Sequence, residues 1–219
     1  MAAYHPDEGL LIQYAAGSLS EPMSLLVATH LALCPRCRAH TEQYDVLGGE
    51  LLEEIDTEIV GSDLRDGVLA QLDASTNAST YISPPLRPSA GMDLRVPEPL
   101  RGYLNAGLDE LDWQSRGPVG EVRILENYEG TTSRLLRIKA GKAMPRHTHG
   151  SKELTLVLAG GFISQGRHFV RGDVEAADPT VDHAPIADDS EDCFCFAINE
   201  GELRFTGPFM RLLNPFVRL

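Results

Sequence analysis

A histidine and two cysteines stand close together early in the chain, in the stretch His30-Leu-Ala-Leu-Cys34-Pro-Arg-Cys37. If this stretch is a helix that runs into a tight turn, His30 and Cys34 lie at positions i and i+4 on one helical face. Cys37 follows a proline that can open the next helix. One imidazole and two thiolates are three ligands of a tetrahedral zinc site, and His5, just ahead of the first helical pattern, is the predicted fourth ligand. The four side chains would form a closed, structural site.

Two other interpretations of these residues remain open. Cys34 and Cys37 form a C-x-x-C pair, which also occurs in redox proteins. His30 lies among apolar residues and is also compatible with an ordinary core histidine. The combined spacing of histidine and cysteines is more specific than a lone C-x-x-C pair, and it favours zinc.

A second set of possible ligands lies near the middle of the chain. His147 and His149, at i and i+2, project to the same side of a predicted strand, and Glu153 opens the next strand. His183 is the best candidate for a fourth ligand, and His168 is the reserve. Two or three imidazoles with a carboxylate suit zinc, iron or manganese.

Cys193 and Cys195 are two further cysteines at i and i+2, which predicts that both thiols share one face of a strand. Side by side, they could ligate a metal or be oxidised. The alternative is that they are small buried hydrophobic residues.

Length, composition and cysteine usage bound the class of protein. The chain has 219 residues, 42% of them hydrophobic, which is enough for real cores and suggests one large or two small domains. Its start does not resemble a secretory leader, and no apolar run approaches the roughly 18 residues of a membrane span. The cysteines fall in two close pairs that are too short to staple a secreted fold. These features predict a cytoplasmic protein without a membrane anchor.

The charge is strongly negative and unevenly distributed. The formal net charge is −13, and residues 41–73 hold ten acidic side chains and a single basic one, Arg65. Direct binding to nucleic acid is not expected, because phosphates require a basic surface. A protein partner with a basic surface fits better, although acidic helix faces that only keep a small domain soluble are an alternative.

The first 75 residues are predicted to form four helices, because apolar residues recur at helical spacing within 7–16, 20–34, 35–55 and 62–72. Such a small bundle has little core, so a metal clip would stabilise it. The apolar stripe of the fourth helix either packs on the bundle or docks on a partner. That stripe consists of Leu64, Val68, Leu69 and Leu72.

Residues 76–97 are rich in serine and proline and are predicted to be a linker, whereas residues 98–219 have the texture of short strands separated by glycine turns. The clearest strands are predicted at 119–128, 133–138, 154–158, 161–165 and 193–198. This indicates an antiparallel sandwich or barrel. We therefore expect a multidomain α plus β chain, with a helical domain at 1–75 and a β domain at 98–219 as separate, tethered units.

Residues 141–160 resemble the first cupin motif, G-x5-H-x-H-x3-E-x6-G, at every fixed position. The second cupin motif departs from the usual pattern. Gly172-Asp173 supplies its turn, but ten residues separate Gly172 from His183, and no asparagine follows that histidine.

With both halves considered together, the chain resembles the zinc-dependent anti-sigma factors of the ChrR type, in which a small helical zinc domain precedes a C-terminal cupin. The resemblance covers nearly the whole chain. It rests on the first histidine, the H-x3-C-x2-C core, the proline-bearing linker, the H-x-H-x3-E motif and the later C-x-C pair. These residues are His5, His30, Cys34, Cys37, His147, His149, Glu153, Cys193 and Cys195.

The resemblance implies a function for each half. The helical domain, with Zn2+ on His5, His30, Cys34 and Cys37, would hold an extracytoplasmic-function-type sigma factor off core RNA polymerase. The cupin would relieve this inhibition under oxidative stress, which for the best-known relatives means singlet oxygen. Its own metal, Zn2+ or less readily Fe2+ or Mn2+, would lie on His147, His149, Glu153 and His183.

Two rival hypotheses remain. The first is a cupin dioxygenase, because three nitrogens, one carboxylate and open coordination positions on iron can activate O2. The appended acidic, zinc-clipped domain adds nothing obvious to turnover, which favours a regulatory protein over an enzyme. The second is a cupin sensor whose helical half binds some other regulator.

Overall fold

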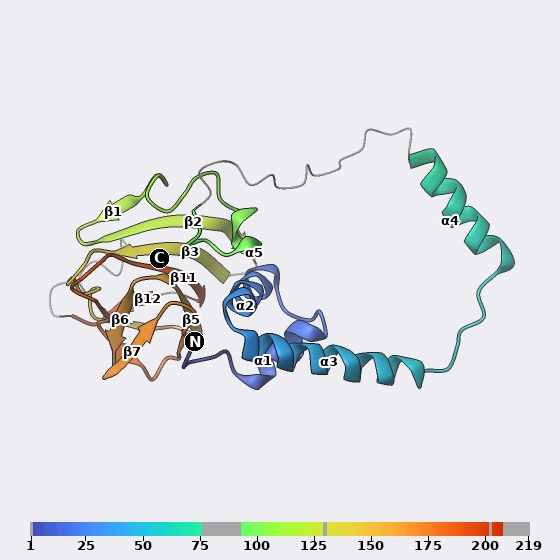
Figure 1. The fold of residues 1–219 in the computed structure, drawn as a ribbon, viewed down its shortest axis with the longest axis horizontal. Helices are drawn as coiled ribbons and strands as arrows, with labels where there is room; N and C mark the ends of the chain where they lie inside the picture. The colour runs from blue at the N-terminus through green and yellow to red at the C-terminus, as the bar shows by residue number, and fades with distance from the viewer. Residues whose placement is uncertain (1, 76–92, 129–130, 202, 208–219) are drawn as a thin grey trace.

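The computed structural model describes residues 2–75, 93–128, 131–201 and 203–207, with helices first and strands after them (Figure 1). The helices are α1 (Glu8–Ala15), α2 (Glu21–Leu33), α3 (Pro35–Glu53), α4 (Ser62–Ser75) and α5 (Glu98–Arg101). The strands are β1 (Gln114–Arg116), β2 (Val119–Tyr128), β3 (Thr131–Ile138), β4 (His147–His149), β5 (Glu153–Ala159), β6 (Gly161–Ser164), β7 (Arg167–Val170), β8 (Val174–Ala177), β9 (Asp182–His183), β10 (Ile186–Ala187), β11 (Cys193–Glu200) and β12 (Leu203–Phe205). The predicted order of a helical half followed by a β half is confirmed.

Local chemistry determines where the first helices begin and turn. The side chain of Asp7 accepts a hydrogen bond of 2.9 Å from the backbone N–H of Leu10 and so caps α1. Cys34 has extended backbone angles and separates α2 from α3, and Pro35 occupies the first turn of α3. The sharp turn at Cys34 keeps both cysteines of the C-x-x-C pair near the end of α2.

The strands pair in antiparallel fashion throughout the described part of the β half. A six-stranded sheet has the order β1-β2-β3-β11-β5-β8, and two three-stranded sheets have the orders β10-β6-β7 and β12-β4-β9. All five strands predicted from the sequence are present. The antiparallel sandwich or barrel expected for the second half is therefore confirmed.

The central strands of the six-stranded sheet are buried on both faces. Every residue of β5 is buried, and so is every residue of β11 except Glu200. One face of β11 presents Phe194 and Phe196 to a cluster that includes residues of α2, while its other face presents Cys193 and Cys195 to the barrel interior. Strands with two covered faces are continuously apolar rather than alternating.

The helical half covers the face of the six-stranded sheet that carries Phe194 and Phe196. Leu26 of α2 is fully buried in one apolar cluster with Leu135 of β3 and Leu154 of β5. At its rim, the Tyr103 hydroxyl donates a hydrogen bond of 3.0 Å to Glu21. The expectation of two domains joined only by a tether is therefore corrected, because the apolar faces of helix and sheet bury each other.

The end of the predicted linker also belongs to the packed β half. Val96 and Pro97 are buried, and Leu100 of α5 lies in the same apolar cluster as Leu26. Residues 76–92 of that predicted linker lie outside the described residues.

Helix α4 is a different case, because it extends away from the other elements (Figure 1). Its apolar side chains Leu64, Val68, Leu69 and Leu72 are between 45% and 59% exposed. Among the described residues, no apolar cluster includes a side chain of α4. The structure therefore does not show the apolar stripe of α4 packed on the other helices. None of the helices in the described residues is long and apolar enough to cross a membrane.

We predict that Leu26→Ala destabilises the whole protein by about 2–5 kcal/mol, because it leaves a cavity at the junction of helix and sheet. Urea unfolding of the full chain, followed by circular dichroism, measures the loss. Leu64→Ala is the matched control and should change the free energy of unfolding by no more than about 0.5 kcal/mol, because its side chain is exposed. Equal effects of the two substitutions would contradict a shared core.

Candidate metal centres

The four residues predicted as zinc ligands in the helical half come together. One ligand atom from each of His5, His30, Cys34 and Cys37 lies within 4.8 Å of all the others. The Nδ1 atom of His5 is 3.5 Å from Cys34 Sγ and 3.3 Å from Cys37 Sγ. Nitrogen and sulfur corners of a tetrahedral zinc site are about 3.6 Å apart, so the spacing fits this metal.

The ring of His30 is oriented as a metal ligand should be. Its Nδ1 atom lies 2.9 Å from the carbonyl oxygen of Gly172, so Nδ1–H donates and Nε2 keeps its lone pair. Nε2 is buried and has no hydrogen-bond partner in the described structure. Burial lowers the pKa of His30 to about 4, so the imidazole is neutral near pH 7. A buried, neutral and unpaired nitrogen is well suited to bind a metal ion.

The two thiols complete this set. Cys34 and Cys37 are buried and are not joined in a disulfide. Burial, together with the neighbouring Cys34, raises the pKa of the Cys37 thiol to about 12, so a metal ion would have to displace its proton on binding. The convergence of two imidazoles on these thiols supports a metal site over a C-x-x-C redox pair.

A second centre lies inside the β half. The Nε2 atom of His183 is 3.1 Å from His149 Nε2 and 3.1 Å from His147 Nε2, and all three rings are buried. Antiparallel pairing of β4 with β9 sets His147 directly opposite His183. Two nitrogen ligands of one tetrahedral zinc ion are about 3.3 Å apart, so three converging nitrogens fit a metal ion.

Each ring of this centre has an oxygen atom at its Nδ1 position, which leaves Nε2 directed at the shared point. The carbonyl oxygen of Pro145 is 2.7 Å from His147, and the hydroxyl of Ser164 is 2.9 Å from His183. A carboxylate oxygen of Glu153 is 3.2 Å from the third ring, that of His149. Burial also lowers the pKa of His147, which favours the neutral ligand form.

Glu153, predicted as a direct ligand, lies behind His149 and not among the three nitrogens. Asn199 donates a hydrogen bond to its carboxylate, and Thr155 donates another of 3.0 Å. Burial by itself would raise the pKa of Glu153, but the contacts with His149 and Asn199 outweigh it and lower the pKa to about 2. Glu153 is therefore ionised, and its direct ligation of a metal stays a prediction.

The other candidate residues lie apart from both centres. His168, the reserve ligand, is half exposed on β7, with its Nε2 atom 2.9 Å from Asp188. The Sγ atoms of Cys193 and Cys195 are 3.5 Å apart in the buried apolar cluster. The contact with Cys193, together with burial, raises the pKa of the Cys195 thiol, so it stays protonated. This supports the packing interpretation of the pair.

Several residues that support the ligands have no signal in the sequence. Ser164 and Glu175 come from different strands, yet both approach the Nδ1 atom of His183, the latter at 3.5 Å. The carbonyl oxygen of Pro145 contacts Nδ1 of His147, and that of Gly172 contacts Nδ1 of His30. The sequence marked Gly172 only as a turn residue of a degraded cupin motif.

Comparison with known proteins is consistent with this arrangement. Residues 104–203 match the family model described as the ChrR cupin-like domain. The chain is 39% identical over 216 residues to the anti-sigma-E factor ChrR of Cereibacter sphaeroides, and the match covers 99% of this chain and 98% of that protein. This chain belongs to the ChrR family. The resemblance seen in the sequence is thereby confirmed.

Two solved structures extend the comparison. The crystal structure of Rhodobacter sphaeroides SigE in complex with the anti-sigma ChrR matches with a TM-score of 0.77 and 38% identity, over 91% of this chain and all of that one. An RmlC-like cupin protein from Ralstonia eutropha matches at 22% identity and a TM-score of 0.38, over 43% of this chain and 64% of its own, a likeness too weak to bear on function. Membership of the ChrR family makes this chain a regulatory protein and not a cupin dioxygenase.

We predict that the purified chain binds two metal ions, because each ligand set is separate and complete without the other. Cys37→Ser should remove one ion per chain, and His149→Ala should remove or weaken the other. Elemental analysis of the dialysed proteins measures both. His168→Ala is the control and should keep two ions. A Cys37→Ser chain that still holds two would rule out the first centre.

Proposed function

We propose that this chain is an anti-sigma factor that binds an extracytoplasmic-function-type sigma factor and keeps it from core RNA polymerase. The observation that carries the proposal is similarity over almost the full length to a protein named anti-sigma-E factor and to a chain crystallised with SigE. The helical half is the proposed binding part, because it contains the large apolar surface described next.

An exposed helical arm, residues 46–72, supports a protein partner. It comprises the second half of α3, the connection that follows and most of α4. Eleven large apolar side chains on it are at least 45% exposed. They are Val46, Leu47, Leu51, Leu52, Ile55, Ile59, Val60, Leu64, Val68, Leu69 and Leu72. Exposed apolar surface of this extent is characteristic of a docking site.

The charge of the arm indicates what kind of surface would receive it. Acidic residues are interspersed with the apolar ones in the arm, while Arg65 is its only basic residue. On α4, Leu64, Val68 and Leu72 are spaced i, i+4 and i+8 and so share one face. Such a helix fits an apolar groove with basic side chains along its rim. A DNA- and polymerase-binding protein offers basic surface of this kind.

The first metal centre would determine how the arm is presented. His5, the end of α2 and the start of α3 meet there, so a bound Zn2+ would clamp three segments of chain together. The direction in which α3 leaves the body of the protein depends on this clamp. Loss of zinc would release the arm from a fixed position.

For the second half, we propose a cupin that receives an oxidative signal, such as singlet oxygen, and relieves the inhibition. Three buried histidines that converge on one point support a metal centre, with Zn2+ proposed before Fe2+ or Mn2+. The packing of α2 on the cupin sheet supports a physical route from this centre to the helical half. The protein would act by binding and release, without direct contact with nucleic acid.

The test is transcription in vitro with an extracytoplasmic-function-type sigma factor as the target. Full-length protein should inhibit transcription stoichiometrically. Val68→Glu should weaken binding of the sigma factor at least about 10-fold, because a charge would enter the apolar face of α4. Ala70→Glu adds the same charge to the opposite side of the helix and should change affinity less than about twofold. Equal loss in both variants, or no inhibition by the wild type, would contradict the proposal.

The release step has its own prediction. A light-activated dye that generates singlet oxygen should dissociate the complex of sigma factor with the wild-type chain. It should leave intact the complex formed with His147→Ala, because that variant lacks one ligand of the cupin centre. Native gel analysis before and after illumination measures both. Dissociation at the same rate in the two complexes would show that the cupin metal centre plays no part in release.

A further inference from the structure

The turn between β7 and β8 touches the zinc centre of the helical half. The carbonyl oxygen of Gly172 is the acceptor for Nδ1 of His30, at 2.9 Å and fully buried. Gly172 has a φ of +93°, and a Cβ atom there would lie 3.6 Å from Leu33 and 3.7 Å from Ala2. The turn therefore uses a conformation that favours glycine where its backbone approaches the end of α2.

The next residue, Asp173, holds the segment that leads into His5. Its carboxylate is fully buried, and Oδ1 accepts hydrogen bonds from the backbone N–H groups of Ala3 and Tyr4. The other oxygen accepts one of 2.9 Å from the N–H of Val170 in the cupin. A single carboxylate thus ties a cupin strand to the chain immediately before a zinc ligand.

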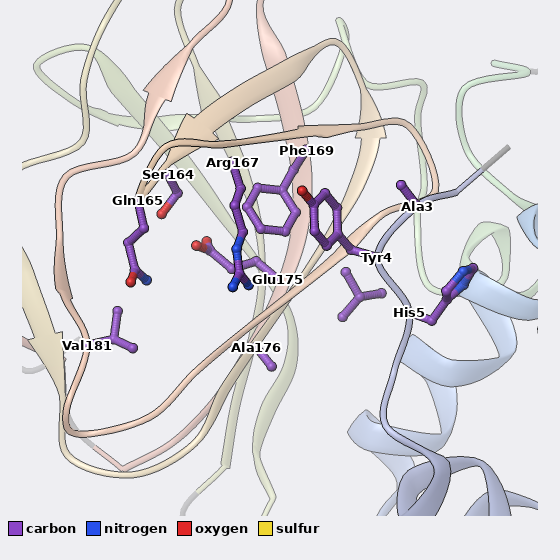
Figure 2. Close-up of a pocket in the computed structure, with 11 residues that line it drawn as sticks. Ala3, Tyr4, His5, Ser164, Gln165, Arg167, Phe169, Glu175, Ala176 and Val181 are labelled. Atoms are coloured by element: carbon purple, nitrogen blue, oxygen red, sulfur yellow. The ribbon is translucent and has the colours of Figure 1, made fainter.

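The same segment is attached to the cupin at two further points. The N–H of Val174 donates a hydrogen bond of 3.1 Å to the carbonyl oxygen of Tyr4. The ring centroids of Tyr4 and Phe169 are 4.5 Å apart, and Figure 2 shows the two rings side by side. His5 follows directly, so these contacts determine where its imidazole lies.

From the other side, the elements that form this turn reach the cupin centre. Two residues after Asp173 on the chain, the carboxylate of Glu175 lies 3.5 Å from Nδ1 of His183. Ser164 of β6 contacts the same nitrogen at 2.9 Å, and β6 pairs with β7. Both strands that flank the turn are therefore linked to one cupin ligand, through Glu175 on β8 and through Ser164 on the neighbour of β7.

A cavity of about 540 Å³ separates these two sides. Tyr4 and His5 line it on one side, and Ser164 and Glu175 line it from the barrel (Figure 2). Because the chain around His5 borders this cavity, the barrel does not pack directly against it there. Its position depends on the contacts with Asp173, Val174 and Phe169.

We propose that the Gly172–Asp173 turn is a positioning element that couples the cupin centre to the zinc centre. It orients His30 through a carbonyl oxygen and His5 through the backbone of Ala3 and Tyr4. A displacement of His183 moves β6 or β8, and the turn transmits that movement to both imidazoles of the zinc centre. The inference deepens the proposed release function, on which it rests, by naming the route from cupin to helical half.

The positioning role is tested with Co2+ in the first centre. A thiolate–Co2+ charge-transfer band reports only that centre, because the cupin ligands contain no sulfur. Ala3→Pro removes one N–H donor to Asp173 without altering the barrel, and Asp173→Asn replaces the acceptor. Both should lose Co2+ to a chelator about 10-fold faster than the wild type, as expected when a supporting contact of a ligand is lost.

Ala2→Pro is the matched control, because the N–H of Ala2 makes no hydrogen bond in the described structure. It should release Co2+ at the wild-type rate. Ala3→Pro and Ala2→Pro variants that release Co2+ equally fast would overturn the positioning role. Ala3→Pro keeps the test decisive even if Asp173→Asn weakens the fold of the cupin.

Coupling is tested by a double-mutant cycle. His183→Ala should speed Co2+ release from the first centre in the wild-type background, but not further in the Ala3→Pro background. Effects that simply multiply, or no effect of His183→Ala on the first centre, would overturn the coupling. No sigma factor is present in these measurements. A failure of coupling is therefore distinguishable from a failure of the anti-sigma proposal, which only the transcription assay tests.

Discussion

Helix α2 is buried on two sides, and the arrangement of the whole molecule depends on this. One side packs Leu25 and Leu26 against the six-stranded sheet, and the other packs Val27 and Leu31 in the cluster that contains both cysteines of the first candidate metal centre. A helix that is apolar nearly all round is stable only when it is enclosed. Because α2 also carries His30, the contact that joins the two halves also positions a proposed zinc ligand.

In the two candidate metal centres, four of the five imidazoles have an oxygen atom beside Nδ1, whereas His5 directs its own Nδ1 at the thiols of Cys34 and Cys37. His30 donates to a backbone carbonyl, as does His147, while His149 and His183 face side-chain oxygens of Glu153 and Ser164. These partners select the tautomer whose Nε2 atom is free for a metal. Burial lowers the pKa of His30 and of His147, so both stay neutral. Metal binding at either centre then requires little rearrangement of the rings.

The helical arm, in contrast to α2, leaves its apolar side chains exposed. Helix α4 has 14 residues, and isolated helices of that length are only marginally stable in water. Its apolar stripe has no cover within the described protein, while the body of the protein has buried its own apolar faces. Closely spaced acidic side chains along the arm keep this surface hydrated and disfavour association of one arm with another. A partner with a complementary basic, grooved surface would supply the missing contacts.

Local spacing was enough to predict much of this protein. The i, i+4 relation of His30 and Cys34 is a property of any helix, and the i, i+2 relation of His147 and His149 is a property of any strand. The helices, the main strands and the pairing of His30 with Cys34 and of His147 with His149 could therefore be predicted without a structure. The continuous apolar runs of β5 and β11 also indicate strands buried on both faces, which requires that another element pack on the outside of the sheet.

Only the tertiary structure decided how the two halves meet. His30 and Gly172 are 142 positions apart, and Asp173 and Ala3 are 170 apart, so no periodic pattern relates them. The placement of Glu153 beside His149, and not among the three nitrogens, likewise depends on Asn199 from another strand. Sequence spacing determines which side chains share a face of one element. Which face meets which depends on the burial of apolar surface across the whole chain.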